Sequence, residues 1–300
     1  MGKSVRAGLV GSGPWARKIH APGLAEHSGV EFTHLWARNA DDARALASKY
    51  GLEICTSHAE LVNAVDLVSY SVPPAVQAPL ATAARAMGKA VLLEKPAAQS
   101  VADARRLEQA AGPASPPAVV NYSRLLDAYM QEWIADHRNR SWADARIVMT
   151  NGAILSDNPF ARSAWRHEAD AGLWDLGPHA FSLLVALLGP VTSVAARLSD
   201  RVVRVSADHS RGGRSEVRCS VAAGDEQSFE FVTRDGECLR PSSAFDSAPA
   251  FRRALDVLLY GAVNVGDIAA SDLRVSTHIV QVLASSARSL ADGLRCPIDL

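Results

Sequence analysis

The sequence has no excess of charge of either sign. Its 300 residues include 31 Lys and Arg against 32 Asp and Glu, which gives a formal net charge of −1, and they contain no basic block. A nucleic-acid groove or an anionic membrane surface requires clustered positive charge. We therefore expect neither nucleic acid nor a membrane as partner, and a small-molecule substrate instead.

Cysteines and long apolar runs are also scarce. Cys55, Cys219, Cys238 and Cys296 are scattered without metal-ligand spacing, and the N-terminus lacks the apolar core of a signal peptide. We expect reduced thiols in a cytoplasmic protein without a metal site. The longest apolar stretch, Phe181 to Leu188, is too short to span a bilayer.

The chain has enough length and apolar residues for two cores. At 300 residues, 48% of them hydrophobic, it favours two domains over one. The first half alternates short apolar strands with helical stretches, which predicts a doubly wound parallel sheet. We place the last strand of this first α/β domain at Ala118 to Tyr122, so the domains are predicted at 1–122 and 123–300.

A glycine-rich turn follows the first predicted strand, Val5 to Val10, and precedes a helical stretch to Leu24. Its sequence, G-S-G-P-W-A, is the G-x-G-x-x-A form of the dinucleotide fingerprint in the strand–turn–helix context that the fingerprint requires. The first glycine permits the tight turn, the second admits a pyrophosphate, and the alanine lets the helix pack on the strand. A plain strand–helix turn is the alternative. The predicted cofactor contacts here are Gly11, Ser12, Gly13, Pro14 and Trp15.

The second predicted strand, Val30 to Trp36, ends in Ala37, Arg38 and Asn39. Enzymes that bind NAD usually carry an acidic residue at this place, which accepts a hydrogen bond from the ribose 2′-hydroxyl, and this chain has none there. Arg38 could pair with a 2′-phosphate, while Asn39 supplies neutral hydrogen bonds. The sequence therefore favours NADP over NAD, although Arg38 could also be merely solvated.

Further short strands are predicted at Ile54-Cys55 and at Val65 to Tyr70, and the second of these ends in Ser71, Val72 and two prolines. Pro73 and Pro74 would form a stiff wall beside the nicotinamide half of a dinucleotide. An alanine-rich helix, Pro79 to Met87, is predicted next.

The most informative strand end is Val91 to Leu93, followed by Glu94, Lys95 and Pro96. Three aliphatic residues indicate a strand buried on both faces, and proline cannot extend the ladder. Because the carboxyl ends of parallel strands border the ligand crevice, Lys95 is aimed at whatever binds there. A surface Glu–Lys pair before a turn is the alternative. Glu94 alternates to the opposite face, so we expect it to hold local structure.

These motifs, in this order, resemble the Gfo/Idh/MocA oxidoreductases: the glycine turn, Val72-Pro73-Pro74, Gly88-Lys89 and above all Glu94-Lys95-Pro96. The resemblance covers the first domain. It implies a Rossmann domain followed by an α/β domain with a large, mostly antiparallel open sheet. It also implies that Lys95 faces both nicotinamide and substrate. The remaining cofactor contacts expected on this basis are Ser71, Val72, Pro73, Gln77, Glu94 and Asn121.

Two positions depart from the family pattern. Members often carry Thr-Pro and then a histidine where this chain has Val72-Pro73 and Gln77, which leaves some hydrogen bonds to the cofactor or substrate in doubt. Asn121 and Arg124 match positions near the family's active site, and the alternative roles are a helix cap and a surface arginine.

The second half carries two further candidate elements. An irregular loop, Leu155 to Ala171, contains Trp165 and Arg166, which we assign to substrate recognition. Asp175 and His179 follow, and D-x-x-x-H after a glycine matches the family's second active-site motif. Pro178 would begin a helix, which places His179 in its first turn.

His179 is then expected to act as a general acid or base. A helix N-terminus disfavours the imidazolium form and a nearby carboxylate favours it, so His179 could titrate near neutrality. A satisfied core histidine is the alternative.

From Val191 to Arg240, predicted strands follow one another without intervening helices, which predicts antiparallel pairing. Polar and apolar residues alternate along them, which predicts one solvent-exposed face of the sheet. That face could cover substrate or pair with a second copy, so a homodimer or higher homo-oligomer through the C-terminal sheet is expected. Helices are predicted at Phe251 to Tyr260 and Ser271 to Leu290, within the second domain.

Together these features predict an NADP-dependent oxidoreductase. Hydride would pass between nicotinamide and a carbon bearing oxygen in a sugar, polyol or related metabolite, with Lys95, Asp175 and His179 as catalytic residues. Whether Lys95 or His179 carries the proton is left open. The alternatives are a non-catalytic NADP-binding regulator and a reductase of an imine or tetrapyrrole.

Overall fold

The computed structural model describes residues 4–110, 112, 115–155 and 158–299. The chain forms two compact units. The first comprises residues up to 127 with 246–263 and 270–277, and the second comprises 128–245, 264–269 and 278–300. The predicted domain boundary after Tyr122 lies five residues before Asp127, where the chain first passes from the first unit to the second. The chain then returns to the first unit twice, which a single boundary did not allow for.

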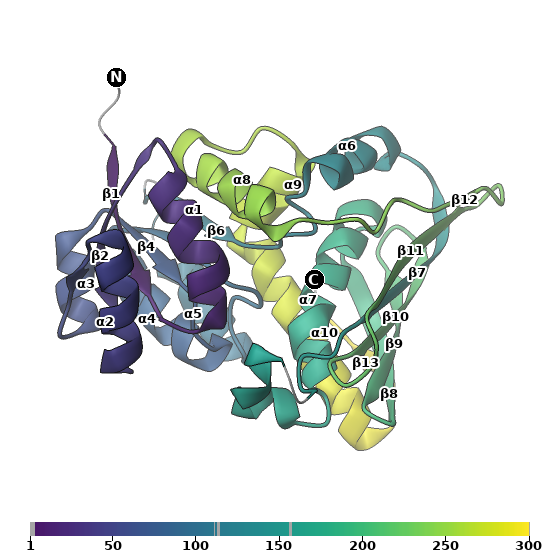
Figure 1. Cartoon of the computed structure of the whole chain (residues 1–300). Coiled ribbons are helices and arrows are strands. Elements are labelled where there is room, and N and C mark those ends of the chain that lie inside the picture. The colour runs from purple at the N-terminus through teal and green to yellow at the C-terminus, as the bar shows by residue number, and fades with distance from the viewer. Residues whose placement is uncertain (1–3, 111, 113–114, 156–157, 300) are drawn as a thin grey trace. The chain divides into compact units, whose positions relative to one another are not determined.

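The first unit is built on a six-stranded parallel sheet in the order β3-β2-β1-β4-β5-β6 (Figure 1). This is the doubly wound arrangement, and it confirms the predicted Rossmann fold. Every residue of β4 is buried, which requires packing on both faces of the sheet. The strands are β1 (Val5–Val10), β2 (Val30–Trp36), β3 (Glu53–Ile54), β4 (Leu67–Tyr70), β5 (Ala90–Leu93) and β6 (Ala118–Val120).

Capped helices connect these strands. Side chains of Asn39, Ser57 and Ser100 accept backbone N–H bonds at the first turns of α2, α3 and α5, which satisfies donors that lack a partner within the helix. The helices of this unit are η1 (Ala16–His20, a π-helical turn), α1 (Ala21–Glu26), α2 (Ala40–Tyr50), α3 (His58–Ala64), α4 (Pro74–Ala86), α5 (Val101–Gln109) and α8 (Ser247–Tyr260).

The prolines after β4 begin the next helix. Pro73 is the N-cap of α4 and Pro74 its first residue, a position that suits proline because the N–H there has no partner within the helix. The helix predicted from Pro79 therefore begins five residues earlier.

Helix α8 belongs to the first unit and not to the second, where the sequence had placed it. It packs on β5, β6 and η1. A Cβ on Gly23 of α1 would lie 2.3 Å from the Phe251 ring, so the two helices approach closely because residue 23 has no side chain. His27 and Asp256 add a polar contact of 3.2 Å.

The second unit is built on a seven-stranded sheet in the order β12-β11-β7-β10-β9-β8-β13. The expected mostly antiparallel sheet is confirmed, with one exception: β7 and β10 are parallel neighbours. Strand β10 pairs with β9 on one side and with the much earlier β7 on the other, which sequential hairpins did not suggest. The strands are β7 (Trp142–Thr150), β8 (Val191–Ser199), β9 (Val202–His209), β10 (Arg214–Ser220), β11 (Glu226–Thr233), β12 (Cys238–Leu239) and β13 (Cys296–Pro297).

Helix α7 (Ala171–Leu188) packs on β7, β9 and β10 and forms the core of this unit (Figure 1). It begins seven residues before Pro178, so the predicted position of His179 in a first turn is wrong. The buried Leu173 and Leu176 extend the apolar face toward the N-terminus, and this packing outweighs the preference of proline for a helix start.

The other helices are α6 (Ala128–His137), η2 (Pro159–Arg162), η3 (Ala164–His167), α9 (Val265–Ser271) and α10 (Leu273–Asp292).

Helix α7 is long and apolar enough to cross a membrane, and the bent pair α8 and α9 would also qualify if it were one span. However, 83% of the 18 residues of α7 are buried, as in the core helix of a folded domain.

Candidate active site

The glycine turn lies where the ends of β1, β2 and β4 meet. The Gly11 N–H donates to Trp36 O over 2.9 Å. Gly11 has a φ of +117°, and a Cβ there would lie 2.3 Å from the Ser71 carbonyl oxygen, so only glycine fits. At Gly13 a Cβ would meet nothing within 4 Å. The Gly13 carbonyl oxygen accepts the first helical hydrogen bond, which Arg17 N–H donates. The turn thus leaves open space at a helix N-terminus, which fits a pyrophosphate.

The end of β2 presents an exposed arginine. Arg38 is solvent-accessible, next to Ala37. The Asn39 side-chain oxygen accepts bonds from Asp41 N–H (3.0 Å) and Asp42 N–H (3.1 Å), so that oxygen serves as the cap of α2. Arg38 is therefore the residue at this strand end with donors suited to an anion.

Glu94, directly after β5, is the centre of a buried hydrogen-bond network. Its Oε1 accepts from Trp15 Nε1 at 3.0 Å, from His20 Nε2 at 3.0 Å and from Asn121 Nδ2 at 2.9 Å. The Glu94 side chain is only 13% exposed. The predicted residues Trp15, Glu94 and Asn121 are thus brought together, and the network links the glycine turn to the strand end that carries Lys95.

His20 was missed at the sequence level. It is fully buried, and its other ring nitrogen lies 2.8 Å from Ser69 Oγ. Two local signals pointed to it: a histidine on the buried face of the first helix, and a serine within an otherwise apolar strand. Buried polar groups are nearly always paired, so each implied a partner.

The environment of Glu94 keeps it ionised. Burial raises its pKa, but hydrogen bonding and charge from His20, the charge of Lys95 and the Asn121 bond together hold the pKa below its ordinary value. Because an ionised carboxylate only accepts, His20 Nε2 must carry the proton in this bond. The contribution of Lys95 places its ammonium close enough for the two charges to interact.

Gln77 shapes the turn after β5. Its Nε2 donates to the carbonyl oxygens of Glu94 (2.7 Å), Pro96 (3.3 Å) and Ala97 (3.2 Å), and its Oε1 accepts from Glu94 N–H at 2.8 Å. It is fully buried. The structure thus gives Gln77 a scaffolding role for the segment that carries Lys95, where the sequence had suggested direct contact with the cofactor.

Asn121 and Arg124 follow β6, the neighbour of β5. Since Nδ2 of Asn121 donates to Glu94, Oδ1 points the other way; it is buried and has no hydrogen-bond partner within the described parts of the chain. A buried acceptor of this kind suits a donor on a bound cofactor. Burial lowers the pKa of Arg124 to about 10, with Asp127 acting in the opposite direction.

The second candidate constellation lies in the second unit. Arg166 of η3 makes two bonds to Asp175 of α7, from Nε to Oδ2 at 2.9 Å and from Nη2 to Oδ1 at 3.3 Å. The Arg166 guanidinium carbon is 4.3 Å from the Trp165 ring centroid. His179 is half-buried one helical turn after Asp175, so both side chains leave the same face of α7.

The expected loop from Leu155 to Ala171 contains the two short helices η2 and η3, and its residues 156 and 157 lie outside the described residues. Nowhere in the described ranges do three His, Cys, Asp or Glu side chains gather as metal ligands would. The four cysteines are free thiols, three of them buried.

The parallel sheet and its glycine turn define a dinucleotide-binding Rossmann domain. Residues 5–122 match the GFO_IDH_MocA family, described as an oxidoreductase family with an NAD-binding Rossmann fold. The chain is 26% identical over 210 residues to the uncharacterized oxidoreductase YdgJ of Escherichia coli, covering 66% of this chain and 58% of that protein.

The chain is also 30% identical over 253 residues to glucose-fructose oxidoreductase domain-containing protein 2 of Bos taurus, covering 81% of this chain and 62% of that protein. The matches thus span between half and two thirds of these curated relatives. A myo-inositol dehydrogenase from Lactobacillus casei, solved with NAD(H) and myo-inositol, shares the fold with a TM-score of 0.81 at 16% identity, over 99% of this chain and 97% of that one. Residues 5–122 therefore match the Gfo/Idh/MocA family of oxidoreductases over its NAD-binding Rossmann domain.

Proposed function

We propose that the protein is an NADP-dependent oxidoreductase acting on a hydroxyl or keto carbon of a sugar, polyol or related metabolite. The observation that carries the proposal is the bond from Trp15 of the glycine turn to Glu94, at 3.0 Å. It fixes the phosphate-binding turn to the strand end that presents Lys95. The bound nicotinamide would supply hydride transfer, and the residues around it would bind, orient and exchange the proton.

Lys95 would donate a hydrogen bond to the substrate oxygen and stabilise negative charge that develops there during reduction. We propose that Asp175 and His179 of the second unit also act on the substrate. His179 would exchange the proton, and Asp175 would orient it or accept a bond from a substrate hydroxyl. Either Lys95 or His179 could be the proton carrier.

The preference for NADP rests on Arg38. The residue is exposed at the end of β2, and its planar donors match a 2′-phosphate. The Asn39 side-chain oxygen already caps α2, so it is not free to accept from a ribose 2′-hydroxyl.

Cofactor binding is tested with a pair of glycine variants. Gly13→Ala meets nothing within 4 Å in the protein, so it should fold as the wild type and lose NADPH affinity by at least tenfold, because its methyl group fills the pyrophosphate space. Gly11→Ala collides with the Ser71 carbonyl and should also lose stability. Wild-type NADPH affinity in Gly13→Ala, measured by calorimetry, would refute the site.

Catalysis is tested with a panel of sugars and polyols, followed at the nicotinamide absorbance. Turnover separates an enzyme from a non-catalytic NADP-binding regulator, and parallel assays of imine and tetrapyrrole substrates address the remaining alternative. The pH–rate profiles of Lys95→Met and His179→Ala then identify the proton carrier. If both variants kept wild-type turnover, the assignment of catalytic residues would be wrong.

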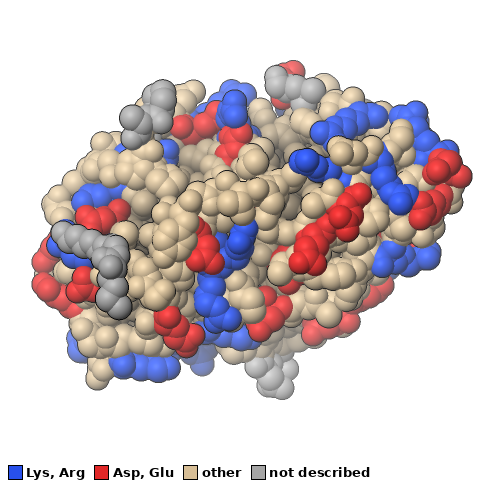
Figure 2. Space-filling view, turned by 90° about the horizontal axis from the view of Figure 1, so that it is seen from above, with Lys and Arg blue, Asp and Glu red and all other residues tan. Residues whose placement is uncertain are grey.

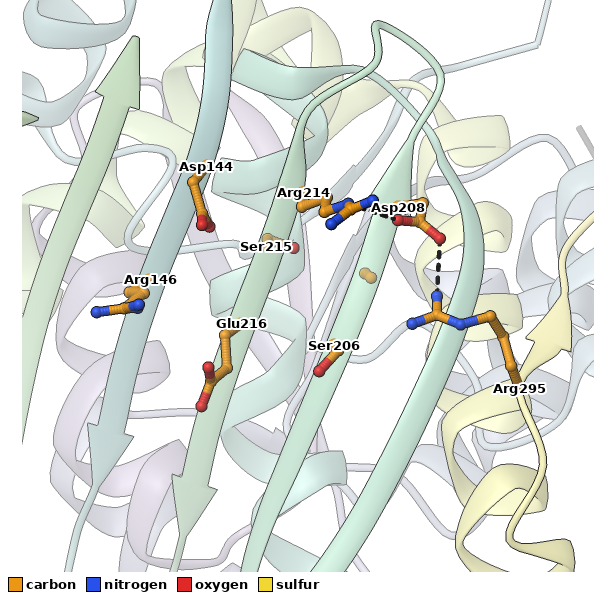
Figure 3. Close-up of a pocket in the computed structure, with 9 residues that line it drawn as sticks. Asp144, Arg146, Ser206, Asp208, Arg214, Ser215, Glu216 and Arg295 are labelled. Atoms are coloured by element: carbon orange, nitrogen blue, oxygen red, sulfur yellow. Dashed lines mark hydrogen bonds and ion pairs between the residues drawn. The ribbon is translucent and has the colours of Figure 1, made fainter. Parts of the chain in front are cut away.

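We further propose that the exposed face of the second sheet pairs with a second copy of the chain. Side chains of both signs are interspersed on the surface seen in Figure 2. On the second sheet, charged side chains of both signs line a pocket of about 460 Å³ (Figure 3). Its lining comes mainly from β7, β9 and β10, and on the parallel neighbours β7 and β10 Asp144 is opposite Arg214 and Arg146 is opposite Glu216.

The four charges alternate in sign along each strand and between the two strands, so the patch is complementary to the same patch on a second copy. A two-fold axis parallel to the strands, lying in the plane of the interface between β7 and β10, would place Asp144 over Arg214 of the partner subunit and Arg146 over Glu216 of the partner subunit. Closed homodimers require such matching of a patch with itself. In the described ranges neither Asp144 nor Arg146 makes an ion pair or side-chain hydrogen bond within the chain.

A further inference from the structure

The loop before α7 is attached to that helix through one ion pair. Arg166 of η3 donates Nε and Nη2 to the two oxygens of Asp175, and the two side chains are 17% and 8% exposed. Two-point contact between guanidinium and carboxylate fixes the orientation of both groups, which a lysine at this place could not do. Asp175 therefore has one defined orientation on α7.

Other contacts hold Arg166 itself in place. Its guanidinium carbon lies 4.3 Å from the Trp165 ring centroid and 5.1 Å from that of Phe160, both within the same loop. The other side of η3 is held by Arg201, whose Nη2 donates to His167 O at 2.5 Å. A cation between aromatic rings loses little side-chain entropy on pairing, so the geometry is set before any ligand binds.

The helix that carries Asp175 is equally fixed. A Cβ on Gly172 would lie 2.8 Å from the Ser220 Cα and 3.0 Å from the Cys219 carbonyl oxygen, so α7 contacts the backbone of β10 directly. Thus neither partner in the ion pair is free to shift independently of the core of the second unit.

Arg166 is a charged group bonded directly to Asp175. Within the described part of the unit, Arg146, Arg204 and Glu216 of β7, β9 and β10 are exposed, at positions that alternate with the buried residues of these strands. Burial raises the pKa of Cys219 to about 12, so that thiol is neutral. The charged residues of α6, Glu132 and Asp136, are exposed, and His167 of η3 directs its Nε2 to Ala161 O. Two histidines also lie near α7 in the described part of the unit: His209 of β9, whose Nδ1 is 2.9 Å from Gly189 O and whose pKa is lowered by burial, and His179, one turn along α7 from Asp175.

We propose that Arg166 is a positioning residue, which acts through Asp175 and not by contacting substrate. It holds Asp175 ionised and in one orientation, so that the carboxylate stays a pure acceptor for His179 or for a substrate hydroxyl. This role rests on the proposed oxidoreductase function, and it replaces the direct substrate contact that the sequence suggested for Arg166.

The test is the titration of Asp175 in the full-length protein, followed by carbon NMR of ¹³Cγ-labelled aspartate. Asp175→Asn assigns the signal. In Arg166→Gln, the apparent pKa of Asp175 should rise by about 1–3 units, because an adjacent arginine lowers the pKa of a carboxyl by about that amount. Arg166→Lys should give a smaller rise, since it keeps the charge and loses the second bond.

The matched control is Arg162→Gln. Arg162 is an exposed arginine of η2 in the same loop, so its removal changes the loop charge equally and should leave the Asp175 titration unchanged. An unchanged Asp175 titration in Arg166→Gln, or an equal shift in both variants, would overturn the proposal. A role of Arg166 in packing alone would alter thermal stability without moving this titration.

The measurement needs neither cofactor nor substrate. Failure of the proposed function would appear instead as loss of NADPH binding or of turnover in the wild type. The two outcomes can therefore be distinguished.

Discussion

Replacing Asn121 by aspartate tests whether Glu94 is ionised in the folded protein. In the wild type, Asn121 Nδ2 donates to Glu94 Oε1 over 2.9 Å. Asn121→Asp removes this donor and places a second carboxylate at the same distance. At 2.9 Å and an effective dielectric constant of about 20, two negative charges repel by about 6 kcal/mol.

The pair can avoid this repulsion by binding one proton. Holding a proton at pH 7 on a carboxyl with an ordinary pKa near 4.5 costs about 3 kcal/mol, at about 1.4 kcal/mol per pH unit. The protonation cost of about 3 kcal/mol is smaller than the charge repulsion of about 6 kcal/mol, so the folded variant should keep one carboxyl protonated at neutral pH. That O–H would also replace the lost Nδ2 donor.

The sign of the pH dependence follows from proton counting. Above about pH 4.5 the folded variant binds one proton that the unfolded chain does not, so its stability falls by about 1.4 kcal/mol for each unit of rising pH. The variant should be destabilised by about 3 kcal/mol at pH 7 and by less than about 1 kcal/mol at pH 5. In the wild type the depressed pKa of Glu94 gives the opposite trend, since that stability is present above pH 4.5 and is lost as pH falls through the folded pKa.

Hydrogen exchange measured by mass spectrometry on peptides from β5 and β6 provides the assay, because it reports opening of the first unit without assuming two-state unfolding of the whole chain. Asn121→Leu is the control. It removes the same donor without adding charge, so its cost of about 1–3 kcal/mol should not depend on pH. Equal pH profiles for the two variants would show that Glu94 is protonated or that the contact is absent, and would refute the network.

Three further predictions concern other parts of the chain. Burial lowers the pKa of His278, with His209 acting in the same direction, and Val191 N–H donates to His278 Nε2 at 2.9 Å. The second unit should therefore lose stability as pH falls below the ordinary histidine pKa of 6.5. His278→Gln keeps an acceptor and should reduce this pH dependence of stability in urea unfolding. A slope unchanged in this variant would contradict the assignment. Arg38→Asp should reverse the preference between NADPH and NADH by at least tenfold in calorimetric titrations, whereas Arg44→Ser, an exposed change in α2, should not; equal affinities of the wild type for both cofactors would exclude the role of Arg38. Arg146→Glu should dissociate the dimer in light scattering and the double variant Arg146→Glu/Glu216→Arg should restore it, so a wild type that stays monomeric at every concentration would exclude the sheet interface.

The first unit could be predicted from sequence because its signals are local. Strands buried on both faces appear as continuous aliphatic runs, and the glycine turn follows from the one conformation that Gly11 must adopt. The Ser71 carbonyl that excludes a side chain at Gly11 lies at the next strand end, so even this turn is completed by a contact between distant segments.

The predictions that failed depended on distant contacts or on competing local preferences. Pro178 was interpreted as a helix start, whereas the buried apolar residues before it extend α7 back to Ala171. The assignment of α8 to the first unit depends on Phe251 meeting Gly23, more than two hundred residues away in sequence, and no local pattern encodes that contact.

Glu94 shows why strand alternation alone could not assign its role. Alternation predicted that Glu94 points away from the direction of Lys95, and it suggested that only Lys95 matters for chemistry. Yet the carboxylate determines how its neighbours are presented: it requires the proton on His20 Nε2, and it turns the Asn121 amide so that Oδ1 is left to accept from a ligand. A neutral residue at position 94 would leave His20 free to choose its tautomer and Asn121 free to rotate. The charge of Glu94 therefore shapes the site around Lys95 through its bonds to His20 and Asn121.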